Sequence, residues 1–240
     1  MEVWFVNYLQ MLSVLGVGGA HPGGLLLTKS IFEKEQFPIP SKILDAGCGT
    51  GQSSSYLYQL GYEVKGLDKD PVMIEHAKKR NATLEIDIPY LNQDLSNIKE
   101  PNESYDIVMC ESVLNFTPLS ETLPEIERVL KPNGIVIAIE MIRNELLSKE
   151  DFEEISTFYG FPSIFSIEEW KDQFAKHNLM TYKILSENDF TFPSLEEPTT
   201  EFHFNDLIPE NTFDILSMHE HITLKYQDKL SYRIFFARKK

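Results

Sequence analysis

The sequence predicts an α/β fold built on a doubly wound, mostly parallel sheet. Short apolar runs alternate along the chain with helix-compatible segments, and the first apolar run ends in a glycine-rich turn. Such alternation places parallel strands in one sheet with helices on both faces, joined by right-handed crossovers. The 240 residues, 42% of them apolar, can bury one sizeable core, so a single domain is expected over residues 1–240.

The first part of the chain contains successive strand–helix units. The expected elements are a strand over Ser41–Ala46, a helix over Ser53–Leu60, a strand over Tyr62–Asp68 and a helix over Val72–Arg80. Asp70-Pro71 precedes this second helix, and a capping aspartate before a first-turn proline is typical of a helix start. A third, weaker strand is expected over residues 86–92, where Pro89 interrupts the register.

Two strongly apolar strands follow. Tyr105–Cys110 and Ile135–Glu140 have the composition of buried strands in a parallel sheet. Between them, Leu119–Leu130 has a helical pattern, in which Pro124 marks either a kink or the true start. Lys131-Pro132-Asn133-Gly134 is expected to be a turn into the second strand.

The pattern changes beyond residue 141. Ser148 and Ser166 each precede acidic residues as helix caps do, and the second of these helices is expected to end near His177. The last expected elements are a strand near Met180–Leu185, a helix over Asp214–Tyr226 and a strand over Ser231–Ala237. The chain therefore ends in strands rather than in a second nucleotide-binding half.

The residues that point to chemistry follow the first strand. Asp45-Ala46-Gly47-Cys48-Gly49-Thr50-Gly51 places three glycines at alternate positions between a strand and a helix. Glycine is needed where the backbone takes positive φ angles or approaches a ligand closely, and ligands of open α/β sheets bind beyond the carboxyl ends of the strands. Asp68 ends the second strand, where a carboxylate can accept hydrogen bonds from both hydroxyls of a ribose. The pattern indicates an adenosine-containing cofactor.

Several segments together resemble one family. ILDAGCGTG (residues 43–51) resembles the first motif of class I S-adenosylmethionine-dependent methyltransferases, and GLDKD (residues 66–70) resembles their ribose-binding motif. Gln93-Asp94-Leu95 is similar to the segment that carries the family's adenine-contacting acid. YDIVMCESVLNF and EIERVLKPNGIVIAIE resemble the fourth-strand motif and the helix, turn and fifth strand after it, while the terminal SYRIFFARKK resembles the antiparallel seventh strand.

The resemblance implies a Rossmann-like sheet of seven strands with an antiparallel last strand, and a cofactor-binding core over residues 41–141. It implies S-adenosyl-L-methionine as the cofactor. The residues it assigns to cofactor binding are Asp45, Gly47, Cys48, Gly49, Gly51, Asp68, Lys69, Asp94, Leu95 and Glu111. Glu111 lies at the end of the fourth strand, and two interpretations of it stay open. It either contacts the methionine end of the cofactor or the acceptor, or it is only a polar residue that ends the strand.

Two alternatives to a methyltransferase stay open. Dinucleotide dehydrogenases also place glycines after a first strand, but their spacing is G-x-G-x-x-G, whereas the spacing here is G-x-G-x-G. An NAD-dependent oxidoreductase is therefore disfavoured. The other alternative is a cofactor-binding protein without turnover.

Methyl transfer makes few demands on side chains, because the enzyme mainly aligns acceptor, carbon and sulfur. A base is needed only if the acceptor loses a proton, and the candidates are His21, Glu111 and Glu140. His219-Glu220-His221 has the look of a metal pair, but residues two apart diverge on a helix and no third ligand is evident. We therefore expect no metal.

The acceptor is narrowed by charge and by missing motifs. A formal charge of −15 disfavours nucleic acid and stable membrane association. The Pro-Pro-aromatic run of many nucleic-acid amino-methyltransferases is absent, because Glu111-Ser112-Val113-Leu114 stands there, and a cysteine cluster typical of arsenite methyltransferases is missing. A small molecule, a lipid-like molecule or a peptide side chain remains. Cys48 and Cys110 lie far apart and suggest no disulfide, so a reducing, cytoplasmic location is expected. The sequence leaves the oligomeric state open.

Additions to the core are expected to form a cap over the acceptor. These are an N-terminal helical lid over residues 1–40 and insertions at 142–165 and 190–229 among the C-terminal strands of residues 142–240. The loop Gly18–Gly24 carries His21 and is expected to bend over the cofactor, although an idle helix lead-in is the alternative. Aromatic residues are expected either to line an apolar pocket or to pack a core; they are Phe152, Phe158, Tyr159, Phe161, Phe165, Phe190, Phe192, Phe202 and Phe204.

Overall fold

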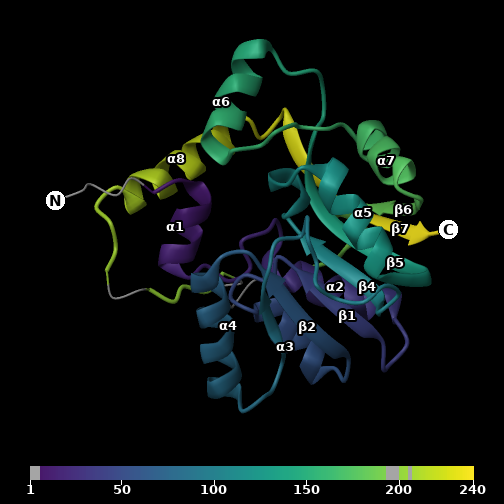
Figure 1. The fold of residues 1–240 in the computed structure, drawn as a ribbon. Coiled ribbons are helices and arrows are strands. Elements are labelled where there is room, and N and C mark those ends of the chain that lie inside the picture. The colour runs from purple at the N-terminus through teal and green to yellow at the C-terminus, as the bar shows by residue number, and fades with distance from the viewer. Residues whose placement is uncertain (1–5, 193–199, 205–206) are drawn as a thin grey trace.

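The computed structural model describes residues 6–192, 200–204 and 207–240 (Figure 1). Its strands are β1 (Lys42–Ala46), β2 (Glu63–Asp68), β3 (Tyr90–Asn92), β4 (Tyr105–Glu111), β5 (Leu130–Arg143), β6 (Leu179–Leu185) and β7 (Leu230–Lys239). They form one sheet in the order β3-β2-β1-β4-β5-β7-β6. Only β7 among them runs antiparallel, pairing with β5 and β6, so the predicted sheet is confirmed.

Several of the helices begin at a residue whose side chain caps the first turn. They are α1 (Tyr8–Leu15), α2 (Gly24–Glu35), α3 (Gln52–Gln59), α4 (Pro71–Leu84), α5 (Leu119–Val129), α6 (Lys149–Tyr159), α7 (Ile167–Lys176) and α8 (Thr212–Lys225), with short 3₁₀ turns η1 (Leu114–Phe116) and η2 (Glu187–Asp189). Asp70 accepts a hydrogen bond from the Val72 N–H, and Ser148 accepts one from the Asp151 N–H. Ser166 and Glu169 form a capping box. The three predicted helix starts are confirmed.

Successive residues of a strand point to opposite faces of the sheet, and helices cover both faces. Both faces are therefore buried. Leu44, Val108 and Val136 pack with α5 and α7, around the fully buried Trp170 and Phe174. The neighbouring strand residues Ile43, Ile107 and Ile137 point to the other face, where they pack with Leu27 of α2 and Leu57 of α3. Two separate apolar layers therefore hold the sheet between helices, which is the doubly wound arrangement.

Two details of the strands differ from the prediction. β3 covers only residues 90–92, because Pro89 has no N–H to donate to a ladder. β5 begins at Leu130, so residues 131–134, predicted to be a turn before the strand, lie within it as an irregularity between the Tyr105 and Ile107 pairings. Pro124 lies inside α5, which starts at Leu119.

A third apolar cluster lies outside the two sheet layers. α1, α6 and α8 lie together at the end of the molecule beyond the carboxyl ends of the parallel strands (Figure 1). Met11 and Leu15 from α1 pack with Ile155 from α6 and Ile222 from α8. The helices come from three distant stretches of chain and share one core, which we call the cap cluster. Residues 1–5, 193–199 and 205–206 of the predicted cap lie outside the described residues.

Candidate active site

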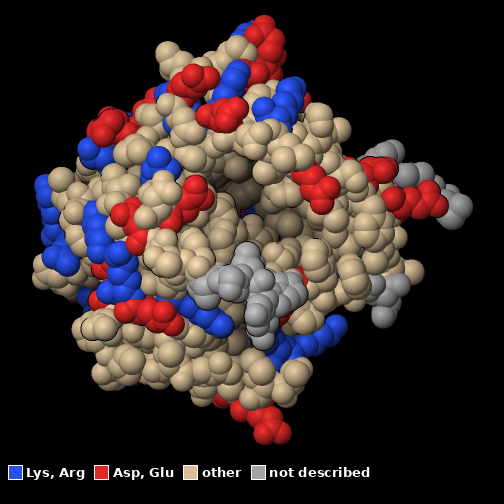
Figure 2. Space-filling view, turned by 180° about the vertical axis from the view of Figure 1, so that it is seen from behind, with Lys and Arg blue, Asp and Glu red and all other residues tan. Residues whose placement is uncertain are grey.

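A cavity of about 610 Å³ lies between the carboxyl ends of the parallel strands and the cap cluster. Its floor is formed by segments that follow four strands: residues 47–50 after β1, 68–70 after β2, 93–95 after β3 and 111–113 from the end of β4. β1 lies between β2 and β4, so the chain leaves the middle of the sheet in opposite directions at this point. Figure 2 shows a hollow in one face of the molecule, bordered largely by residues that are neither acidic nor basic.

The glycine loop needs glycine for different reasons at its positions. Gly47, Gly49 and Gly51 all have positive φ angles, of 81°, 51° and 73°. A side chain at Gly47 would collide with Val113, and one at Gly51 would collide with Tyr90. At Gly49, a Cβ atom would have no atom within 4 Å and would enter the cavity. Gly49 therefore keeps open the space that a ligand would occupy, whereas the other two glycines allow close packing.

Asp68 ends β2 and lies against the glycine loop. Its Oδ2 accepts a hydrogen bond from the Gly49 N–H at 3.0 Å, and its Oδ1 accepts one from the Asp70 N–H at 2.9 Å. Burial raises the pKa of Asp68, and these two N–H groups act against that rise. A carboxylate has about four acceptor sites, so each oxygen can still accept one more bond. The position suits two neighbouring hydroxyl groups of a ligand.

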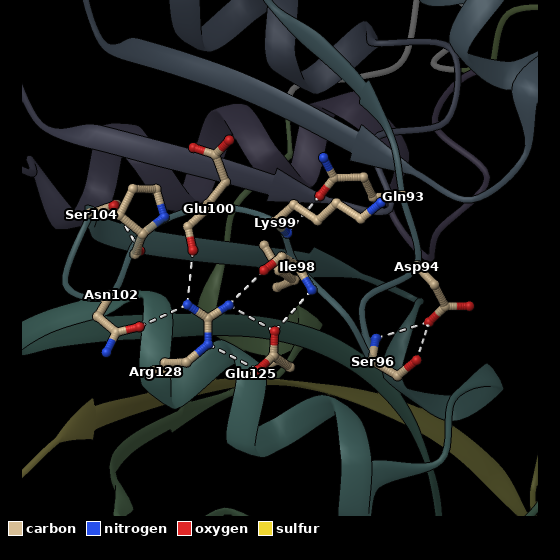
Figure 3. A network of polar contacts seen from close by, with 11 residues as sticks. Gln93, Asp94, Ser96, Ile98, Lys99, Glu100, Asn102, Ser104, Glu125 and Arg128 are labelled. Atoms are coloured by element: carbon tan, nitrogen blue, oxygen red, sulfur yellow. Dashed lines mark hydrogen bonds and ion pairs between the residues drawn. The ribbon is translucent and has the colours of Figure 1, made fainter.

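Asp94 lies in the loop after β3. Its Oδ1 accepts hydrogen bonds from the N–H and hydroxyl of Ser96, and these bonds lower the pKa of the carboxyl group (Figure 3). The carboxylate therefore stays ionised near neutral pH. Asp94 and Leu95 both line the cavity, together with Gln93, which the sequence analysis did not assign to the site.

Arg128 of α5 holds this loop in place (Figure 3). Its guanidinium donates to the carbonyl oxygens of Ile98 and Glu100 and to the side-chain oxygen of Asn102, at 2.6 to 2.9 Å. Glu125 pairs with the same guanidinium and accepts a bond from the Ile98 N–H. The planar group thus connects several points of the loop that carries Asp94 to one helix.

Glu111 is the centre of a buried polar cluster on the cavity wall. It accepts hydrogen bonds from the hydroxyls of Thr28 at 2.5 Å and Ser53 at 2.6 Å. His21 Nε2 lies 3.3 Å from Glu111 Oε2, within ion-pair distance but without the alignment of a hydrogen bond, and Nδ1 lies 3.2 Å from the Pro22 carbonyl oxygen. Both ring nitrogens of His21 therefore lie close to oxygen atoms of the protein.

Asp45 and Glu140 are buried behind the cavity instead of lining it. Asp45 accepts a bond from the Ser54 hydroxyl, and its burial, together with the charges of Glu111 and Asp68, raises its pKa to about 8. Burial likewise raises the pKa of Glu140 to about 8, although its carboxylate accepts N–H bonds from residues 113–115. Glu140, a candidate base from the sequence, therefore fixes the turn after β4, so the structure gives it a supporting role.

The structure brings most of the predicted cofactor residues to one cavity. Its lining includes Gly47, Cys48, Gly49, Asp68, Lys69, Asp94, Leu95 and Glu111, and also His21. Asp45 and Gly51 do not line it; they support the loop from behind. Burial raises the pKa of the Cys48 thiol well above its usual range, so this lining residue stays protonated. The sequence analysis also missed Thr50, Gln52 and Ser53, although their position directly after the glycines was a usable signal.

The aromatic residues divide between the two expected roles. Tyr159, Phe161 and Phe202 line the cavity, joined by Tyr8 and Phe116, which the sequence analysis had not included. The others pack elsewhere or face outward: Phe152, Phe158, Phe165, Phe190, Phe192 and Phe204.

Of the two histidines considered as a metal pair, His219 lines the cavity and His221 does not. Among the described residues there is no group of three or more side chains placed to hold a metal ion.

Comparison with known proteins identifies the family. A family model described as a methyltransferase domain matches residues 44–138. The chain is 38% identical over 235 residues to YodH of Bacillus subtilis (strain 168), an uncharacterized methyltransferase, and the match covers 97% of this chain and 99% of YodH. The chain belongs to the class I S-adenosylmethionine-dependent methyltransferases. The oxidoreductase alternative is thereby excluded, and S-adenosylmethionine is the cofactor of this methyltransferase.

Solved structures share the fold of the methyltransferase at low sequence identity. Haemonchus contortus phosphoethanolamine N-methyltransferase 2 in complex with S-adenosyl-L-methionine is similar with a TM-score of 0.72 and 18% identity, over 91% of this chain and 53% of that one. The MccD protein is similar with a TM-score of 0.71 and 16% identity, over 92% of this chain and all of that one.

No helix in the described part of the methyltransferase is long and apolar enough to cross a membrane.

The residues around the cavity fit the cofactor. Gly49 leaves open the space beside Asp68, and two buried side-chain oxygens, Thr50 Oγ1 and Gln52 Oε1, have no hydrogen-bond partner among the described residues. Buried polar atoms without partners are rare in folded proteins, and a bound ligand is one way to satisfy them. Both oxygens belong to residues that line the cavity next to the glycine loop.

Proposed function

We propose that this methyltransferase transfers the methyl group to a small, partly apolar acceptor that enters the cavity from the cap side. The supporting observation is that one cavity joins the glycine loop and Asp68 to a wall of aromatic and aliphatic side chains from α1, α6 and α8. A cavity of this size, lined by apolar groups with a few polar ones, is typical of a small-molecule site. A protein substrate would have to insert a side chain into it.

The core residues have separate positioning roles in this proposal. Asp68 holds the ribose hydroxyls, Asp94 faces the adenine, and Gly47, Gly49 and Lys69 border the cofactor. S-adenosylmethionine supplies a methyl group that is activated by its bond to a positively charged sulfur. Glu111 gives the cavity a buried negative charge, which attracts a cationic group of the cofactor. Alignment of the acceptor then accounts for most of the catalysis.

His21 closes the cofactor side of the cavity in this proposal. The loop Gly18–Gly24 connects α1 to α2 and pairs through Gly18 with Glu201, while His21 reaches Glu111. The described parts of residues 1–40 and of the insertions at 142–165 and 190–229 have the role of a lid and cap in this proposal. Cys48 and Cys110 are buried free cysteines, which supports a cytoplasmic location.

The size of the acceptor can be tested with methyl-labelled S-adenosylmethionine. A cell extract is divided by filtration into molecules below and above about 3 kDa, and each fraction is incubated with the protein. Because the cavity admits small molecules, we expect a labelled product, separated by chromatography from S-adenosylmethionine itself, in the low-mass fraction. The Asp68→Ala variant should form much less of this product at an S-adenosylmethionine concentration below the wild-type Kd. Label confined to the macromolecular fraction would contradict a small acceptor.

A further inference from the structure

One hydrogen-bonded pair stands out in the cap wall of the cavity. His219 on α8 and Tyr159 at the end of α6 both line the cavity, and the tyrosine hydroxyl lies 2.9 Å from Nδ1 of the imidazole. The surrounding wall is mainly apolar, with Leu9, Leu12 and Phe161. Neither member of the pair is used by the cofactor site described above.

The charged side chains of the cavity all lie on its other side. They are Asp68, Lys69, Asp70, Asp94 and Glu111, from the segments that follow β2, β3 and β4. Among the described residues of the cap wall there is no Asp, Glu, Lys or Arg. A buried carboxylate or phosphate would need a cation there, and a buried ammonium group would need an anion, because an unpaired charge is costly to remove from water. The wall therefore selects for an uncharged acceptor.

The packing of His219 fixes its ring. The ring of Tyr8 lies 5.1 Å from it between centroids, and the ring of Tyr159 meets it edge-on at 5.8 Å and 84°. Burial lowers the pKa of His219, so the imidazole is neutral near neutral pH. A neutral imidazole has one donor and one acceptor nitrogen. With Nδ1 bonded to the tyrosine, Nε2 remains for a ligand, and a hydroxyl group suits it in either tautomer because it both donates and accepts.

We propose, on the basis of the proposed function, that His219, oriented by Tyr159, hydrogen-bonds a hydroxyl group of an uncharged, mainly apolar acceptor. His219 is then a specificity-determining residue of the acceptor site, and Tyr159 is its positioning residue. The acceptor class is a hydroxylated aromatic or aliphatic molecule without phosphate, carboxylate or ammonium groups.

The test compares three probes of similar shape: 2-naphthol, naphthalene and 2-naphthoate. Their binding is followed by fluorescence in the presence of saturating S-adenosylhomocysteine. We expect 2-naphthol to bind at least tenfold more tightly than 2-naphthoate. His219→Ala should weaken 2-naphthol by about threefold to tenfold, as expected for one hydrogen bond, and naphthalene by less than twofold. Tyr159→Phe should reproduce part of this loss.

His221→Ala is the matched control, because His221 lies on the same helix, is exposed and does not line the cavity. It should leave the affinities for all three probes unchanged. Equal binding of 2-naphthol and 2-naphthoate, equal losses of 2-naphthol and naphthalene in His219→Ala, or failure of all three probes to bind would overturn the inference. S-adenosylhomocysteine binding is measured separately, and its absence would count against the proposed function itself.

Discussion

At the scale of single residues, the carboxylates of this enzyme differ in what their hydrogen bonds leave available. Asp68 accepts hydrogen bonds from two N–H groups, and its carboxylate can still accept further bonds from a ligand in the cavity. The carboxylate of Glu140 instead accepts bonds from the N–H groups of residues 113–115. Both were visible in the sequence as acids at strand ends. Their different roles depend on which N–H groups surround them, which the sequence does not specify.

Replacing Asp68 tests the cofactor site. Asp68→Ala should remove charge-assisted bonds worth about 1.5–3 kcal/mol, which corresponds to roughly tenfold to a hundredfold weaker binding of S-adenosylhomocysteine in calorimetry. Asp172→Ala, an exposed aspartate on α7, is the control and should bind normally. Gly49→Ala should lose more affinity, since its methyl group enters the cavity. Wild-type affinity in folded Asp68→Ala and Gly49→Ala proteins would place the cofactor elsewhere.

His21→Ala separates three roles for that residue. A contact that closes the cavity would weaken cofactor binding by about threefold to tenfold. A general base would lower kcat by about a hundredfold with cofactor affinity kept, and an idle histidine would change neither quantity. The contacts of His21 with Glu111 and Pro22 favour the first result. Calorimetry gives the affinity, and release of S-adenosylhomocysteine gives kcat once an acceptor is found.

Asp45 gives the free enzyme a pH-dependent stability. The pKa of Asp45 is raised to about 8 in the folded state by burial and by the nearby carboxylates, against about 4 in an unfolded chain. The folded state therefore binds the proton more tightly, so this contribution is fully present below about pH 4 and is lost as the pH rises through about 8. We expect Asp45→Asn, which retains an acceptor for Ser54, to gain stability relative to wild type between pH 5 and pH 8. Parallel urea-unfolding profiles of the two proteins over this range would contradict the assignment.

At the scale of elements, the loop after β3 shows how a flexible-looking segment is fixed. Residues 93–104 contain no strand or helix, yet Arg128 connects their carbonyl groups to α5 (Figure 3). Arg128→Ala should lower the free energy of unfolding by about 1–3 kcal/mol and weaken S-adenosylhomocysteine binding, because Asp94 loses its support. Arg128→Lys should rescue little, since an ammonium group lacks the planar fork. Lys171→Ala, which removes an exposed pair on α7, should have a small effect on unfolding.

Elements with local signals were predictable, and those set by distant contacts were not. The capped starts of α4, α6 and α7 and the apolar runs of β1, β4 and β5 follow from neighbouring residues. The extra residues of β5 before Ile135 depend on the pairing of Leu130 with Tyr105, which no local pattern reveals. The same limit explains why Tyr8 was missed from the cavity: its place there depends on α6 and α8.

At the scale of the whole molecule, cofactor binding should stabilise the fold because the cavity is bordered by both the core and the cap. At a concentration one hundred times its Kd, S-adenosylhomocysteine should raise the free energy of unfolding by about 2.7 kcal/mol. NAD at the same concentration should have no effect, since the glycine spacing and the family both exclude it. Thermal melts with each ligand provide the measurement, and stabilisation by NAD alone would reverse the assignment.

The position of β7 has a consequence for how the chain reaches this fold during synthesis. β7 is the last strand in sequence but lies between β5 and β6, pairing with β5 over nine residue pairs. Until residues 230–239 leave the ribosome, β6 has no neighbour in the sheet and β5 keeps an unpaired edge, a condition that favours association between chains. α1 also packs with α8, so α1 cannot complete its packing until the much later α8 has been synthesised. The half of the sheet that borders the cofactor, β1 to β4, can form early in synthesis, whereas the acceptor pocket can form only after α8 has been synthesised.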